Sequence, residues 1–197
     1  MKANFYQDVI LYSGEAAPLS HLQSALFNQL HDKFVKMRKQ NGAQYALAFP
    51  GINDKGVGNV FRIFGENMQA LLDLDIAHIC MASFGTMDFK NPKEVPQDAS
   101  AIRYARKHDQ VSLERRIDGI RKRFKNPEDM ERAIANSHEK VLLDLPFIWT
   151  YSRSTAGADG MPQKFPLHIL KAETDKLASE FNCYGLPTEE GGVPDIR

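Results

Sequence analysis

Apolar residues in the first half of the chain are spaced in a way that predicts four strands. Short segments rich in β-branched and aromatic residues favour this structure, at Phe5–Tyr12, Tyr45–Phe49, Asn59–Phe64 and Ile76–Phe84. A Gly-rich turn joins the second of these segments to the third. The pattern therefore predicts a sheet.

Two other segments carry apolar residues at helical spacing. The first has one at every fourth position, at Leu22, Leu26, Leu30 and Phe34. Ser20 followed by Gln23 has the pattern of a capping box, so we expect this helix to run from Ser20 to about Met37, with Asn41-Gly42 ending it. Met68–Leu74 predicts a second, short helix.

The resulting order, βαββαβ, indicates the fold class. It is the order of the split βαβ, or ferredoxin-like, arrangement, in which two helices cover one face of an antiparallel sheet. RNA-recognition motifs share this arrangement. We therefore expect an α+β protein with an N-terminal ferredoxin-like (RRM-like) domain.

Pro92 and Pro96 lie among charged residues and predict a boundary, which divides the chain into domains 1–95 and 96–197. A helix is expected over about Ser112–Phe124. A second helix should begin at Asn126-Pro127, where Pro and two acids form a strong start signal, and reach roughly Leu143.

The remaining segment predicts a hairpin. Phe147, Trp149 and Tyr151 alternate with Ile148, Thr150 and Ser152, as in a strand. A polar loop over Ser154–Lys164 follows, and Phe165–Leu170 is the expected partner strand. The tail Cys183–Arg197 is rich in Gly and Pro.

Composition narrows the class of protein. The 197 residues are 43% hydrophobic, enough for a globular core. Neither a membrane-spanning segment nor a signal peptide is evident, so we expect a soluble, cytoplasmic protein with no membrane partner. The two cysteines, Cys80 and Cys183, are far apart and favour neither a metal site nor a disulfide, and no cofactor is expected.

Charge is concentrated in one window of a chain that is neutral overall. Ala101–Lys125 holds nine of the 25 Lys and Arg residues and three acids, so it carries 9 − 3 = +6. A concentrated positive field indicates a polyanion partner, because binding to phosphates releases counterions. A solvated helix face is the alternative.

A helical wheel divides this window into faces. One is an apolar stripe expected to face the core, formed by Leu113, Ile117, Ile120 and Phe124. On one flank, acids can neutralise their neighbours Arg121 and Lys125. The other flank has four cations and no acid, and its members are Arg115, Arg116, Lys122 and Arg123. Gly119 lies at its centre, which suggests close approach of a phosphate to the backbone.

Short motifs along nearly the whole chain resemble one family. They are Phe27-Asn28-Gln29-Leu30-His31, Ala48-Phe49-Pro50, the arginine-rich helix, Leu145-Pro146-Phe147, Ser152-Arg153-Ser154-Thr155, Cys183-Tyr184-Gly185-Leu186 and Gly191-Gly192-Val193-Pro194. Their order and spacing are similar to those of the CRISPR-associated type I-F repeat-RNA endoribonucleases, the Csy-four branch of the Cas-six family.

The resemblance implies a function and partners. The protein would bind a CRISPR repeat RNA hairpin with its arginine helix in the major groove and cut at the 3′ base of the stem. The reaction needs no metal, because the 2′-hydroxyl of the RNA attacks the adjacent phosphate and leaves a 2′,3′-cyclic phosphate. The product stays bound, and other subunits of a type I-F effector (Cascade-like) complex are further partners.

The resemblance also implies catalytic residues. His31 matches the general base, and imidazole can accept a proton near neutral pH. On its helix, His31 lies about 100° from the centre of the apolar stripe, at its edge. Ser152 matches a serine that holds the 2′-hydroxyl. Tyr184 matches a tyrosine that places His31 or the substrate, and a packed aromatic is the alternative.

Further RNA-binding residues follow from the resemblance. Ser154 and Thr155 match hydroxyl residues around the scissile phosphate. Phe165 matches an aromatic that stacks on the last base pair, or it is a core residue. The arginine that reads guanines at the stem base is either Arg103, or Arg106 together with His108.

Two alternatives remain. One is a non-catalytic RNA-binding module, and the other is an effector-complex subunit without turnover.

Overall fold

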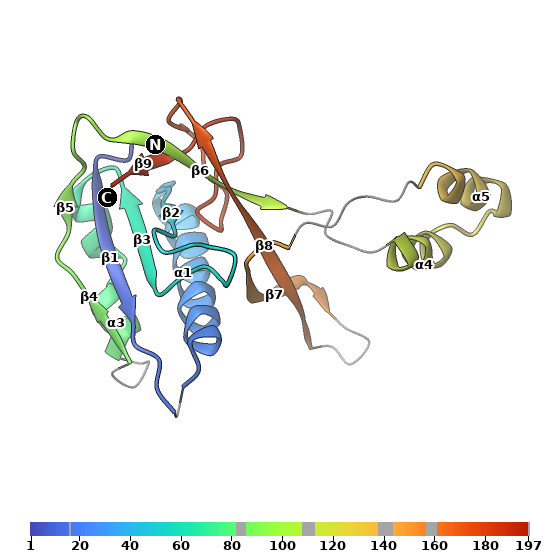
Figure 1. The fold of residues 1–197 in the computed structure, drawn as a ribbon, viewed down its shortest axis with the longest axis horizontal. Helices are drawn as coiled ribbons and strands as arrows, with labels where there is room; N and C mark the ends of the chain where they lie inside the picture. The colour runs from blue at the N-terminus through green and yellow to red at the C-terminus, as the bar shows by residue number, and fades with distance from the viewer. Residues whose placement is uncertain (16, 82–85, 108–112, 138–143, 157–160, 197) are drawn as a thin grey trace.

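The fold is that of a computed structural model, which describes residues 1–15, 17–81, 86–107, 113–137, 144–156 and 161–196. The side chains of residues 153–156 lie outside this description. The described part is a mixed α+β structure with two antiparallel sheets, in agreement with the expected α+β class. Figure 1 shows the two sheets with a long helix between them.

The first sheet contains the N-terminal strands. These are β1 (Phe5–Leu11), β2 (Ala46–Ala48), β3 (Val60–Gly65), β4 (Met87–Phe89) and β5 (Lys93–Glu94). The order is β2-β3-β1-β4, with β5 also paired to β1, and every pair is antiparallel. The first three strands coincide with predicted ones to within two residues at each end.

Helix α1 (Leu19–Asn41) is longer than expected at its C-terminal end. Its four predicted apolar residues are buried. The predicted capping box is wrong: Pro18 is the N-cap, Ser20 lies inside the helix, and Gln23 Nε2 donates to Gly58 O at 2.7 Å. Gly42 ends the helix in the left-handed conformation at φ 73°, as the sequence indicates.

The prediction of a fourth strand over Ile76–Phe84 is wrong for the first part of that segment. Ile76–Met81 is helix α3, and it follows α2 (Met68–Asp73), whose N-cap is Asn67. The buried residues of α3 are Ile76, Ile79 and Cys80, a spacing that suits one helix face. A short apolar run satisfies a helix as well as a strand, so its period alone does not decide between them. The strand in this part of the chain is β4, which begins at Met87, six residues after the last residue of α3.

The second sheet is built from the C-terminal half. It contains β6 (Ser100–Lys107), β7 (Phe147–Ala156), β8 (Pro162–Thr174) and β9 (Val193–Asp195), in the order β7-β8-β6-β9. Strand β6 was not predicted from the sequence, because its Lys and Arg residues obscure the alternation of buried and exposed positions. The predicted polar loop over Ser154–Lys164 is too long, since both hairpin strands extend into it.

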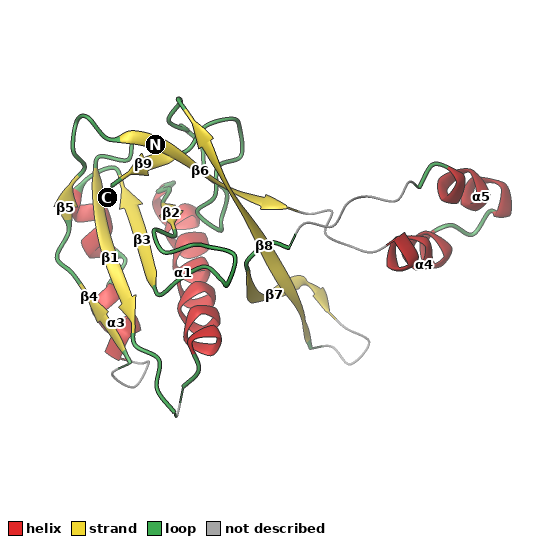
Figure 2. Cartoon of the chain, viewed as in Figure 1, coloured by secondary structure: helices red, strands yellow, loops and turns green. Residues whose placement is uncertain are grey.

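Helices α4 (Leu113–Arg123) and α5 (Pro127–Ala135) stand apart from both sheets, as Figure 2 shows. The apolar stripe of α4 therefore does not face the core as expected. Its helix packs against α5 instead, and no residue of α4 is buried. Asn126 caps α5 by accepting from Glu128 N at 3.0 Å, as its start signal indicates, but this helix ends at Ala135 rather than near Leu143.

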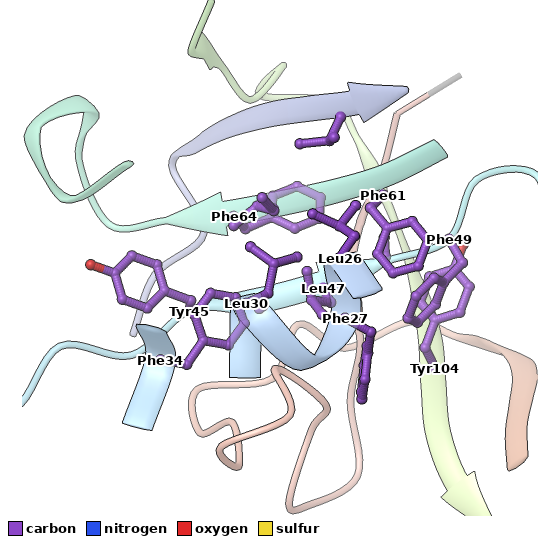
Figure 3. Close-up of a cluster of buried hydrophobic side chains, with 14 of the residues drawn as sticks. Leu26, Phe27, Leu30, Phe34, Tyr45, Leu47, Phe49, Phe61, Phe64 and Tyr104 are labelled. Carbon is purple, nitrogen blue, oxygen red and sulfur yellow. The ribbon is translucent and has the colours of Figure 1, made fainter. Parts of the chain in front are cut away.

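One hydrophobic core joins the two sheets (Figure 3). Phe49, which follows β2, makes edge-to-face contacts with Phe61 of β3 at 5.1 Å and with Tyr104 of β6 at 5.6 Å. These residues are almost fully buried. The core thus fixes the second sheet against the first and positions α1 between them.

The segment between β8 and β9 returns to the end of α1. Leu47 N donates to Gly185 O at 2.8 Å, and Phe181 N donates to Gln44 Oε1 at 3.1 Å. Gly185 has φ 73°, and a Cβ there would lie 2.9 Å from Leu47 Cγ, so glycine is required. This packing places Cys183 and Tyr184 beside the helix. In the described part of the chain, no helix is long and apolar enough to cross a membrane.

Candidate active site

Helix α1 is fixed along the free edge of β7 by Asn28. The Asn28 side chain donates from Nδ2 to Trp149 O at 3.3 Å and accepts from Thr150 Oγ1 at 2.8 Å. Thr150 is fully buried, and β7 is the last strand of its sheet. The bonds satisfy an edge carbonyl and a buried hydroxyl, so the helix and the strand are held in one register.

His31 lies about one turn after Asn28 and contacts the C-terminal segment. Its Nδ1 is 2.8 Å from Cys183 O. A carbonyl oxygen only accepts hydrogen bonds, so Nδ1 carries the proton and donates it. In the neutral imidazole the lone pair is then on Nε2. This is the nitrogen that can act as a base.

Tyr184 holds the plane of the imidazole. Its ring stacks on His31 with centroids 4.4 Å apart and an interplanar angle of 17°, and on Phe27 at 5.9 Å and 7°. Tyr184 is half-buried and Phe27 is fully buried. The imidazole therefore rests on an aromatic pair anchored in the core.

Arg38 supports the backbone that His31 contacts. Its Nη1 donates to Phe181 O at 3.1 Å and approaches Cys183 Sγ at 3.9 Å. From the sequence, no role was assigned to Arg38, to Asn28 or to the Cys183 carbonyl. Their contacts join residues more than 100 positions apart, and the only signal was that Asn28 and Cys183 fall within the family motifs.

Ser152 directly follows Tyr151, which lines a cavity together with His31. Two cavities show that α1 and β7 run in parallel: one is lined by Ser20, Gln23 and Phe147, and the other by His31 and Tyr151. Ser152 is half-buried and has the same orientation as Thr150, because alternate residues of a strand share a face. It is thus on the face of β7 that bonds to Asn28.

The second of these cavities has a volume of about 450 Å³ and borders His31 directly. Its lining residues come from α1 and the β7–β8 hairpin, and they are Asn28, His31, Asp32, Tyr151, Met161 and Pro162. The structure therefore provides space beside the imidazole for a substrate group.

Arg106 joins this site from β6. Its guanidinium lies 5.2 Å from the ring centroid of Phe165 and 5.4 Å from that of Tyr184. Phe165 is half-buried at the border of the core. Arg103 lies an odd number of residues from Arg106 and is on the opposite face of β6. The structure thus brings Arg106, and not Arg103, to the stacking partner of His31, and His108 is outside the described residues.

The cations of α4 are separate from this site. Arg115, Lys122, Arg123 and Gly119 are exposed, Arg116 is half-buried, and a Cβ on Gly119 would meet nothing within 4 Å. Arg121 pairs with Asp118 at 3.5 Å, as the wheel predicts for that flank. Ser154 and Thr155 belong to β7, with side chains outside the described residues.

Among the described residues, no group of three or more His, Cys, Asp or Glu is arranged to hold a metal ion. Residues 6–195 match a family model described as "CRISPR-associated protein (Cas_Csy4)". No curated protein is a significant match to the chain.

Proposed function

Because the chain belongs to the Cas_Csy4 family of CRISPR-associated proteins, whose role is in CRISPR RNA processing, we propose that it is a metal-independent endoribonuclease that cuts the CRISPR repeat stem-loop. The single observation that carries this proposal is the arrangement of His31. Its Nδ1 donates a hydrogen bond to Cys183 O, and its ring is stacked on Tyr184. The side chain also borders a cavity that Tyr151 of β7 lines.

The chemistry follows from this arrangement. Nε2 of His31 accepts the proton of the RNA 2′-hydroxyl, and the oxygen attacks the adjacent phosphorus. The bond from phosphorus to the 5′ oxygen breaks, and that oxygen takes up a proton. The products are a 2′,3′-cyclic phosphate and a 5′-hydroxyl, and no outside nucleophile is consumed.

Ser152 and Tyr184 have positioning roles. The hydroxyl of Ser152 holds the attacking 2′-hydroxyl in line, which lowers the entropic part of the barrier. Tyr184 limits rotation of the imidazole. Ser154 and Thr155, on the same strand, complete the surroundings of the scissile phosphate.

Arg106 and Phe165 form the support for the base of the stem. A phenylalanine ring can stack on the terminal base pair, and a guanidinium can make paired hydrogen bonds to guanine. The contact between Arg106 and both aromatic rings supports this role. This contact favours Arg106 together with His108, rather than Arg103, as the residues that read guanines at the stem base.

One flank of α4 binds the phosphates of the stem. Its cations are Arg115, Arg116, Lys122 and Arg123. The major groove of an A-form helix is too deep and narrow for side chains to read bases. Cations lining that groove can still bind phosphates, and a short stem is open at its loop end. The exposure of three of the four cations supports this assignment.

The finer description of the fold is also part of the proposal. The strand order β2-β3-β1-β4, with α1 between β1 and β2, supports a ferredoxin-like domain over residues 1–95. The RNA-hairpin-binding domain then comprises residues 96–197. The protein remains on its product and so becomes a subunit of a type I-F effector complex.

The test is gel analysis of candidate repeat hairpins incubated with the protein, with and without EDTA. We expect one cut at the 3′ base of the stem, a cyclic phosphate at the new end, and no effect of EDTA. Tight binding without any cut would favour the alternative, a non-catalytic hairpin-binding subunit.

A further inference from the structure

The outer face of the second sheet carries exposed aromatic rings. Phe147 and Tyr151 are 41% and 45% exposed, and Trp149 lies between them with its ring half-buried. Phe147 and Trp149 contact edge to face at 5.3 Å. These three residues, which we name the β7 aromatic row, alternate with the inward-facing Ile148, Thr150 and Ser152.

Cations lie on the same face as this row. Lys164 Nζ lies 4.8 Å from the centroid of the Trp149 ring. The strand register puts Lys107 opposite His168, and His168 opposite Phe147, so all three are on the outer face. Arg103 is on this face as well. The described outer-face positions of β6, β7 and β8 contain no acid.

Two nitrogens on this face have unused hydrogen-bonding capacity. Arg103 Nε and His168 Nδ1 are buried and have no hydrogen-bond partner among the described residues. Buried polar atoms of this kind are uncommon, and a water or an ion is one partner that can satisfy them. Both belong to side chains that an anion would attract.

The row begins at the candidate active site. Tyr151 lines the cavity that borders His31, while Trp149 and Phe147 line the other cavity, of about 610 Å³, beside the start of α1. Lys55 and Gln23 also line that 610 Å³ cavity. The row thus connects the two cavities along the edge strand. From Phe147 to Tyr151 it spans about 14 Å, the length of about four stacked nucleotides.

We propose that the β7 aromatic row binds single-stranded RNA, namely the segment immediately 3′ of the scissile phosphate. This inference rests on the proposed function, because that function places the scissile phosphate beside His31. From there, the strand passes Tyr151 and stacks on Trp149 and Phe147, with its phosphates near Lys164 and Lys107. Aromatic rings with cations and no acids suit such a strand, whereas cores of protein interfaces are depleted in lysine.

The experiment compares the affinities of three RNAs, all with a 2′-deoxy nucleotide at the cleavage position. One is the hairpin alone, one has a single-stranded 3′ extension of about six nucleotides, and one has the same extension at the 5′ end. For the unmodified protein, we expect the 3′ extension to tighten binding about tenfold, since base stacking on aromatic rings is strong. The 5′ extension should add little.

Lys164→Glu and, separately, Phe147→Ala should remove most of the gain from the 3′ extension and leave affinity for the bare hairpin within about twofold. Lys171→Glu is the matched control, because Lys171 is exposed on the same strand but on the other face. It should keep the gain. A thermal melt of each variant confirms folding.

The outcomes separate the two proposals. Failure of the bare hairpin to bind would overturn the proposed function. If the bare hairpin binds but the 3′ extension adds nothing, or if Lys164→Glu and Lys171→Glu behave alike, the β7 aromatic row is not an RNA site. A face that binds a protein subunit instead would give this second result.

Discussion

The carbonyl oxygen of Cys183 lies 2.8 Å from Nδ1 of His31 and determines which imidazole nitrogen can accept a proton. The two residues are 152 positions apart and meet because the C-terminal segment returns to α1. A backbone carbonyl cannot be removed by substitution. The arrangement can be tested through the residues that hold it.

Tyr184 provides the first test. Tyr184→Leu should lower the cleavage rate about 10- to 100-fold, because loss of the flat ring lets the imidazole move out of line. Tyr184→Phe keeps the stack and should retain most of the activity. The rate of a single turnover measures this directly, and hairpin affinity should change little in both variants. Equal loss in Phe and Leu variants would show that the hydroxyl, not the stacking, is required.

The two flanks of α4 should differ in RNA binding. Arg123→Ala should weaken hairpin binding and lower the slope of log affinity against log salt by about one, as expected for one lost phosphate contact. Arg121→Ala is the matched control, because Arg121 already pairs with Asp118. Equal loss in both variants would contradict the assignment of the groove-facing flank.

The ion pair between Arg62 and Asp8 should contribute to folding. Arg62 makes two bonds to the carboxylate, at 2.7 and 2.9 Å, and also donates to Ile196 O. Arg62→Met should lower the free energy of unfolding by about 3 kcal/mol, because Asp8 would remain largely buried without its partner. Urea denaturation measures this change.

The matched control for that pair is Lys90→Met. Lys90 pairs with Asp88 at 2.7 Å, but both side chains are about half exposed. The loss in the free energy of unfolding should be much smaller than for Arg62→Met, because water already solvates both charges of an exposed pair. Similar losses at both positions would mean that burial does not set the strength of these pairs.

Cys80 should resist alkylation in the folded protein. Burial raises the pKa of its thiol from 9.0 to about 11, with Asp88 adding to the shift. The raised pKa favours the protonated thiol in the folded state. This contribution to stability is present below pH 9 and is lost as the pH rises through about 11.

The measurement is mass spectrometry after iodoacetamide treatment at pH 8. Cys80 should remain unmodified in the folded protein and react readily in urea. Rapid modification of Cys80 without urea would contradict its burial, which leaves it 4% exposed.

Periodic segments of the fold could be predicted from the sequence. The residues Leu22, Leu26, Leu30 and Phe34 define one face of α1, and they are buried as expected. Strand β6 could not be recognised from the sequence, because Arg103, Arg106 and Lys107 interrupt the apolar pattern of Ile102 and Tyr104. The run at Ile76 was mistaken for a strand because a six-residue apolar segment has no decisive period.

The candidate site could be predicted only as far as motifs identify residues. His31, Ser152 and Tyr184 were named from the resemblance, and the structure brings His31 against Tyr184. Asn28 and Arg38 could not be assigned, because their roles depend on contacts between distant segments. The choice between Arg103 and Arg106 required knowledge of which face of β6 each one occupies.

The most direct test of the central claim is the cleavage rate of His31→Ala on a repeat hairpin, measured beside its binding affinity. We expect the rate to fall by about 10²- to 10⁴-fold, the usual contribution of a general base, while affinity changes little. His21→Ala, an exposed histidine on the same helix, is the control and should cut normally. Unchanged cutting by His31→Ala would contradict the account.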